Sequence, residues 1–308
     1  MSSVQANEQS PPYIKDVLVA AEHVPADGPN DADSVFSDEQ SSTASISSSI
    51  LGYRRLHGRT YHSDKFATKY FLPNDDQQLE SVELRQDHHY LTILFEDQLF
   101  LAPLEKKKIH RVLDVGIWAI EFADQFPNAS VIGTDLSPCQ PQWVPPNVCF
   151  EIDDAGLEWT WNANHFDFIH MRYLLGGIED WTGLLKEAYR CCAPGGWVES
   201  VELDVEFRSD DRTTELEPVL ASSGDLFREA GKVPVGPWAK DPKLAEIGRF
   251  LGAALENDLQ GYTQMLWKSL QRPADEYHVW LATLRKAIRN PKVHSYMIVH
   301  VVYGRKPE

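Results

Sequence analysis

The hydrophobic pattern between residues 109 and 202 alternates between two kinds of segment. Short runs that are apolar at almost every position occur at 111–115, 130–136, 148–155, 166–175 and 197–203. Amphipathic stretches of helical period occur at 117–126 and 181–192. A strand that is apolar throughout is buried on both faces, which is typical of a parallel sheet covered by helices. The pattern therefore predicts an α/β fold in which ligands bind beyond the carboxyl ends of the strands.

The flanking segments complete a division of the chain into three parts. Residues 1–50 hold eight acidic residues and one basic residue, a composition too polar to offset the entropy of ordering, and we predict a disordered acidic tail. Residues 51–108 are helical and aromatic in pattern, with a helix N-cap at 74–75, and predict a helical cap. Residues 109–308 are expected to form the α/β domain, which closes on a β-branched and aromatic strand at 294–306.

The composition excludes several classes of protein. A net charge of −17 excludes nucleic acid as a direct partner, because phosphate contacts need clustered Lys and Arg. No stretch approaches the roughly 18 apolar residues of a membrane span, and the N-terminus has no signal-peptide pattern. The four cysteines show no CxxC spacing, so we expect neither a metal site nor a disulfide framework. We therefore expect a cytoplasmic or nuclear protein that does not bind membranes.

Acidic and small residues stand at the ends of successive predicted strands. Asp114 and Gly116 end the first strand, Asp135 ends the second, and Asp154 and Ala155 end the third. An acid at the end of the second strand can accept both hydroxyls of a ribose, and one with a small neighbour after the third can accept the exocyclic amine of adenine. A single acid of this kind is more often a helix cap or a turn residue, but their order along the chain predicts a nucleoside site.

Longer stretches resemble a known family. VLDVG (112–116), VIGTDLSPCQPQWVPPNVCFEIDDA (131–155), FDFIHMR (166–172) and APGGWVESVELD (193–204) resemble class I methyltransferases that use S-adenosylmethionine (SAM), and within them the fungal LaeA-like family. HGRTYH (57–62), YFLPND (70–75), HH (88–89) and VYGRK (302–306) are similar to the same family. The resemblance implies a Rossmann-like class I methyltransferase fold, with a mostly parallel twisted sheet, helices on both faces and an N-terminal helical cap.

The resemblance also implies a cofactor and its contacts. SAM would be bound by residues of the sheet edge: Asp114 and Gly116 in the first motif, Asp135 on the ribose, Asp154 and Ala155 beside the adenine, and His170 or Arg172 beyond the fourth strand. The methyl acceptor would be a small metabolite or a protein of secondary metabolism, and regulatory proteins are expected as partners. No residue is singled out as catalytic, although a base would come from His170, Glu202 or the cap.

Aromatic residues and histidines of the cap have two interpretations. Tyr61, His62 and Tyr70 stand where a lid over the site would lie, but aromatics at helical spacing more often belong to a core. His88 and His89 are likewise more often structural than catalytic.

The chain departs from the family pattern in two places. Relatives read approximately VLDVGTGTGIWAIEFA where this chain reads VLDVGIWAIEFA, so about four residues of a strand-to-helix loop, which usually has two to six, are absent. That loop directs backbone amides at the carboxylate of SAM, and Gly116 alone cannot replace it. We expect the strand end or the first helical turn to unwind, Ile117 and Trp118 to replace small residues, and SAM binding to weaken greatly.

The second departure lies between Gly231 and Lys232, where relatives carry an extra helix and most of a strand. We expect KVPVG (232–236) to remain as a strand stub beside the last strand. Three functions stay open: a LaeA-like methyltransferase, a pseudo-methyltransferase that acts as an accessory or regulatory protein, and an NAD-dependent dehydrogenase, which the APGGW turn fits less well.

Overall fold

The computed structural model describes residues 52–64, 66, 68, 70–82, 87–116, 118–138, 144–220 and 231–308. The acidic tail predicted at 1–50 lies outside the described residues. Its disorder and the domain boundary at residue 108 stay predictions.

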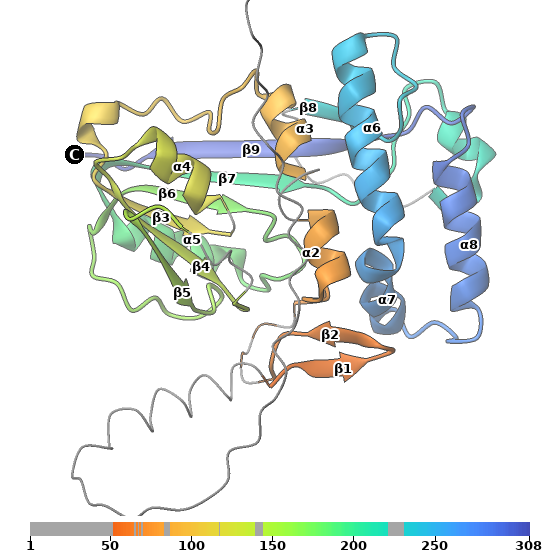
Figure 1. The fold of residues 1–308 in the computed structure, drawn as a ribbon, viewed down its shortest axis with the longest axis horizontal. Coiled ribbons are helices and arrows are strands. Elements are labelled where there is room, and N and C mark those ends of the chain that lie inside the picture. Colours follow the sequence, from red (N-terminus) through yellow and green to blue (C-terminus); the bar gives the residue numbers. More distant parts are fainter. Residues whose placement is uncertain are drawn as a thin grey trace, which may run out of the picture. The chain divides into compact units, whose positions relative to one another are not determined.

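A seven-stranded sheet, in the order β5-β4-β3-β6-β7-β9-β8, organises the fold (Figure 1). Its strands are β3 (Arg111–Val115), β4 (Ser130–Asp135), β5 (Val148–Ile152), β6 (Phe166–Arg172), β7 (Cys192–Leu203), β8 (Gly231–Pro234) and β9 (Tyr296–Arg305). The strands from β3 to β7 pair in parallel, whereas β9 runs antiparallel to both β7 and β8. The predicted α/β fold with a mostly parallel sheet is confirmed, and each predicted apolar run contributes a strand.

Alternate residues of the central strands face opposite helical layers. Val112 and Phe168 pack in a core with α4 (Ala119–Gln125), while Leu113 and Ile169 pack in a core with α5 (Trp181–Cys191). Successive side chains of a strand point to opposite faces, so an apolar run supplies both cores. Helices therefore cover both faces of the sheet, as predicted.

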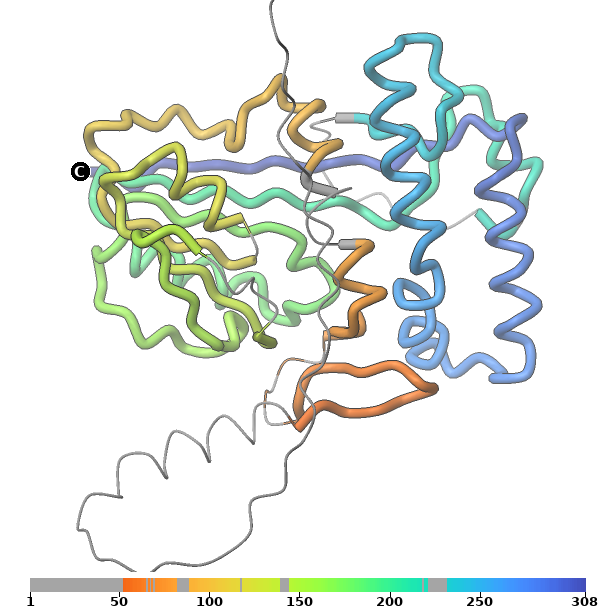
Figure 2. Tube along the Cα trace, in the orientation of Figure 1, coloured from red at the N-terminus to blue at the C-terminus, as the bar shows by residue number. Residues whose placement is uncertain are grey.

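Three helices cover the end of the sheet that contains β8. They are α6 (Pro242–Asn257), α7 (Leu259–Ser269) and α8 (Tyr277–Ile288). The trace in Figure 2 shows α6 beside β8 and α3 (Asp87–Leu94), and α6 contacts both of these elements. A third apolar core forms here, and short 3₁₀ turns, η2 (Thr213–Leu216) and η3 (Pro218–Leu220), connect β7 to this region.

The N-terminal segment contains a β-hairpin where the pattern predicted helix. β1 (Arg54–Leu56) and β2 (Arg59–Tyr61) pair through a turn at His57 and Gly58, whose φ angles are 52° and 80°. Two adjacent residues with positive φ match the twist of a tight hairpin, which outweighs helical propensity here. The predicted helices follow as α2 (Asp76–Val82) and α3, and η1 (Lys106–Lys108) precedes β3.

The strand β8 is short, as the second departure from the family predicts. It pairs only with Tyr296–Val299 at the start of β9. Among the strands that the structure describes, none pairs with His300–Arg305 on this edge. Val302 and Tyr303 are consequently 67% and 47% exposed.

A buried ion network holds the hairpin against the rest of the fold. Arg59 donates to both carboxylate oxygens of Asp75, at 2.6 and 2.7 Å, and to both of Asp258, at 2.7 and 2.5 Å. Burial alone would lower the pKa of Arg59, but the hydrogen bonds to Asp258 and Asp75 outweigh it and keep the pKa above its ordinary value. Asp258 also accepts from Gly261 N at the start of α7. One guanidinium therefore connects β2, the start of α2 and the α6–α7 junction.

We predict that Arg59→Ala lowers the free energy of unfolding by about 3–5 kcal/mol, because the Asp258 side chain, 0% exposed, would lose its counter-charge. Lys108→Ala, which removes an exposed pair with Glu105, should change it by less than about 1 kcal/mol. Urea unfolding followed by circular dichroism measures both. Equal small effects would show that the network does not stabilise the fold.

Candidate functional site

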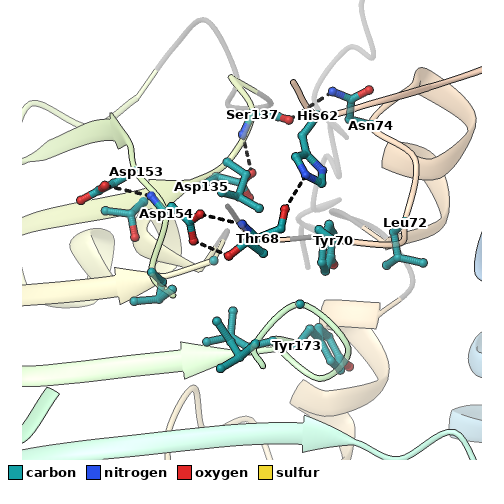
Figure 3. Close-up of a pocket in the computed structure, with 18 of the residues that line it drawn as sticks. His62, Thr68, Tyr70, Leu72, Asn74, Asp135, Ser137, Asp153, Asp154 and Tyr173 are labelled. Atoms are coloured by element: carbon teal, nitrogen blue, oxygen red, sulfur yellow. Dashed lines mark hydrogen bonds between the residues drawn. The ribbon is translucent and has the colours of Figure 1, made fainter. Parts of the chain in front are cut away.

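The carboxyl ends of β3, β4, β5 and β6 face a cavity of about 140 Å³ (Figure 3). Its opposite wall comes from the N-terminal segment and from residues 172–178, which follow or end β6. The sheet side is lined by Val115, Gly116, Thr134, Asp135, Leu136, Ser137, Asp153, Asp154 and Ala155. In open α/β sheets this edge is where ligands bind.

Four predicted site residues lie on this cavity: Gly116, Asp135, Asp154 and Ala155. The parallel register brings the ends of β3, β4 and β5 to one level, because Val115 pairs with Thr134, and Asp135 pairs with Ile152. Asp135 accepts a hydrogen bond from Ser137 N at 2.9 Å. The sequence placed these residues together correctly, and their contacts with a cofactor stay predictions.

Asp154 is bound by the N-terminal segment. Its Oδ2 accepts from Thr68 N at 3.0 Å, and its Oδ1 accepts from Thr68 Oγ1 at 2.5 Å and from Gly156 N at 3.0 Å. The residue is only 3% exposed. Sequence reasoning missed Thr68, because a polar residue in a loop has no pattern that announces a contact 86 positions away.

His62 also lies on the cavity wall, with Tyr70, whereas Tyr61 is 0% exposed in the core. Nε2 of His62 lies 2.8 Å from the carbonyl oxygen of Thr68, which can only accept, so Nε2 carries the proton. Burial lowers the pKa of His62 below its ordinary value. Nδ1 therefore keeps its lone pair near pH 7, and it has no hydrogen-bond partner among the described residues.

Asp114 and His170 do not line the cavity; of the two residues expected beyond the fourth strand, His170 or Arg172, the structure places Arg172 there, and any contact of these residues with a cofactor stays a prediction. Asp114 and His170 are buried on the α4 side, with His170 Nδ1 3.0 Å from Asp114 Oδ1. His170 shares a face of β6 with Phe168, which packs in the α4 core, whereas Arg172 at the end of β6 lines the cavity. His89 packs against Phe250, outside the cavity lining, and the side chain of His88 lies outside the described residues.

The shortened turn unwinds the start of α4, which begins at Ala119. Trp118 N donates to Asp114 Oδ2 at 2.7 Å, and the indole stacks on His170 with ring centroids 4.1 Å apart. Trp118 is 1% exposed, so it fills the core on the α4 face and does not enter the cavity. Ile117 lies outside the described residues.

The residues present fit a nucleoside but not the methionine half of SAM. Asp135, Asp154 and Ala155 supply the acids and the small neighbour that a ribose and an adenine require. At the β3–α4 turn the chain offers Gly116, with φ 144°, and the Trp118 amide is already bound to Asp114. The cavity is also smaller than the roughly 300–1,000 Å³ of most ligand pockets. The arrangement can therefore recognise a nucleoside, whereas the two described residues of the turn, Gly116 and Trp118, have amides that already donate to Thr134 O and Asp114.

The described residues contain neither a metal cluster nor a membrane-spanning helix. No group of three or more His, Cys, Asp or Glu side chains in this part of the chain is arranged to hold a metal ion. No helix in the described ranges is long and apolar enough to cross a membrane.

The chain is similar in sequence to several fungal proteins. A family model described as methyltransferase domain matches residues 87–232. The methyltransferase pytC of Aspergillus terreus is 32% identical over 313 residues, which cover 90% of this chain and 95% of pytC. The secondary metabolism regulator LAE1 of Cochliobolus heterostrophus is 29% identical, with 82% of this chain and 94% of LAE1 covered. The secondary metabolism regulator laeA of Aspergillus niger is 30% identical, with 82% and 76% covered.

These relatives match the chain along most of its length, and its sheet has a parallel core beside an antiparallel last strand. The chain belongs to the LaeA-like family of class I methyltransferases.

Proposed function

We propose that this chain is a SAM-dependent methyltransferase of fungal secondary metabolism, acting on a small metabolite or on a protein. The observation that carries the proposal is the meeting of Gly116, Asp135, Asp154 and Ala155 in one cavity of a LaeA-like chain. Relatives named as a methyltransferase and as regulators of secondary metabolism support it. Family membership sets the NAD-dependent dehydrogenase alternative aside.

The chain itself would align the acceptor and take its proton. SAM, when bound, supplies the methyl group, and transfer to a hydroxyl or amine also requires a base. His170 is buried against Asp114, and Glu202 accepts backbone hydrogen bonds from Leu174 and Leu175. His62, neutral and with its Nδ1 lone pair unpartnered among the described residues, is the base that the geometry favours.

The partners and the compartment that we propose for this protein rest on its net charge and on its relatives. The net charge of −17 favours protein or metabolite partners over direct contact with nucleic acid. We therefore place it in the cytoplasm or nucleus, with regulatory proteins as partners.

A second candidate is a pseudo-methyltransferase that acts as an accessory or regulatory protein. The shortened β3–α4 turn favours it, because Asp114 and Trp118 bond to each other where relatives have a glycine-rich loop. The two candidates differ in one measurable property, which is whether SAM binds through its methionine half.

We predict that Asp135→Ala weakens binding of S-adenosylhomocysteine at least about tenfold, because hydrogen bonds from ribose hydroxyls to a carboxylate are worth about 1.5–3 kcal/mol. Asp124→Ala, at an exposed position of α4, should leave the affinity within about twofold. Isothermal titration measures both. If neither the wild type nor any variant binds this ligand, the methyltransferase proposal fails and the accessory role remains.

We predict that inserting Thr-Gly-Thr-Gly after Gly116 strengthens SAM binding about tenfold or more, because new backbone amides would meet the SAM carboxylate. Adenosine, which lacks that carboxylate, should bind both proteins equally. A control insertion of Ser-Ala-Ser-Ala has the same length without glycine and should gain much less. An unchanged SAM affinity after the glycine insertion would show that the short turn does not limit binding.

A further inference from the structure

A second cavity, of about 550 Å³, lies on the α5 face of β7 and β9. Its walls are mainly apolar and include Leu175, Trp181, Leu185, Val198 and Val302. Glu202 lies in this groove, and the residue is partly exposed.

Residues 173–178 contribute to the wall of the nucleoside cavity opposite the sheet, and we call them the floor loop. The carboxylate of Glu202 holds this loop. Its Oε1 accepts from Leu174 N at 3.2 Å, and its Oε2 accepts from Leu175 N at 2.9 Å. Leu174 lines the nucleoside cavity, whereas Leu175 lines the groove. One side chain therefore connects the two cavities through two adjacent backbone amides.

The floor loop is packed closely between Glu202 and the N-terminal segment. A Cβ added at Gly176 would lie 2.2 Å from the Phe71 ring, and one added at Gly177 would lie 2.7 Å from the Tyr70 ring. Tyr70 is itself a wall residue of the nucleoside cavity. A shift of this loop would therefore change the shape of the cavity.

The loop begins with a strained residue. Tyr173 has a φ of 58°, in the left-handed region, where a bulky side chain is held only by its surroundings. Tyr173 N donates to Val201 O at 3.1 Å, and the hydroxyl groups of Tyr173 and Tyr90 are 2.5 Å apart. The amides of Leu174 and Leu175, which donate to Glu202, complete this support.

We propose that Glu202 is a positioning residue for the nucleoside cavity: as a carboxylate it holds the floor loop closed, and as the neutral acid it lets the loop relax. The inference rests on the proposed function, since it concerns the same cavity. An ionised acceptor makes stronger hydrogen bonds to amides than a neutral acid does. The state of Glu202 thus controls how well the cavity is formed.

Glu202 changes its charge near neutral pH. Burial raises its pKa to about 7, against the hydrogen bonds from Leu175 and Leu174, which lower it. The carboxylate therefore predominates above pH 7 and the neutral acid predominates below it. The floor loop is held more firmly as the pH rises through 7 and is released as it falls.

Other titratable or charged groups face Glu202 from the strands and the helix around it. Those on the groove are Asp204, Tyr189, His300, Tyr303, Arg305 and Lys306. His300 is the register partner of Glu202 on β9, with Nε2 3.5 Å from Asp204 Oδ2. From β6, the charge of Arg172 lowers the pKa of Glu202. His300 is therefore the neighbour that a control variant should replace.

Two measurements test the proposal on the full chain. Isothermal titration with S-adenosylhomocysteine should show affinity about five- to tenfold higher at pH 8 than at pH 6, with a midpoint near 7. Glu202→Gln, whose amide offers one acceptor oxygen, should bind weakly at both pH values and within about twofold of the same affinity. His300→Gln, the matched control, should keep the wild-type profile.

Hydrogen exchange of the amides of Leu174 and Leu175 tests the same point without ligand. After correction for intrinsic rates, we expect both to be more protected at pH 8 than at pH 6 in the wild type and in His300→Gln, and less protected, to the same degree at both pH values, in Glu202→Gln. A Glu202→Gln protein that keeps the wild-type pH dependence in exchange overturns the inference. Loss of ligand binding by every protein, with the exchange pattern intact, instead overturns the proposed function alone.

Discussion

The length of the turn between β3 and α4 is the constraint on which the site depends. The chain has too few residues there for a glycine-rich loop, so Asp114 bonds to the Trp118 amide, and Trp118 stacks on His170. The indole joins Phe122 and Phe168 in the core on the α4 face. Trp118 is therefore part of the packing, and weaker binding of the methionine half of SAM stays a prediction.

The nucleoside part of the cavity is shaped by contacts that do not involve the β3–α4 turn. Asp154 is held by Thr68, and Thr68 is bonded to His62 on the wall opposite the sheet. The hairpin that leads into this wall is fixed by Arg59 between Asp75 and Asp258. The cavity is therefore shaped by the N-terminal segment as much as by the sheet, and loss of a buried charge far from the cavity would disturb it.

At the opposite end of the sheet, the edge strand β8 is short. The short β8 leaves part of β9 without a neighbour among the described strands, and the face shared by β7 and β9 opens as an apolar groove. Glu202 stands between that groove and the floor loop of the nucleoside cavity. Glu202 therefore lines the groove and supports the floor loop of the nucleoside cavity at the same time.

Periodicity was enough to predict the parallel sheet, its helical layers and the meeting of Gly116, Asp135, Asp154 and Ala155, because the strand period is local and parallel strands bring their carboxyl ends to one edge. The hairpin at His57 and Gly58 was predicted as helix, since a turn with positive φ has only a short signal. The direction of His170, the contact of Thr68 with Asp154 and the hold of Glu202 on Leu174 needed the tertiary structure. Each joins residues far apart in sequence, and only packing decides which polar groups meet.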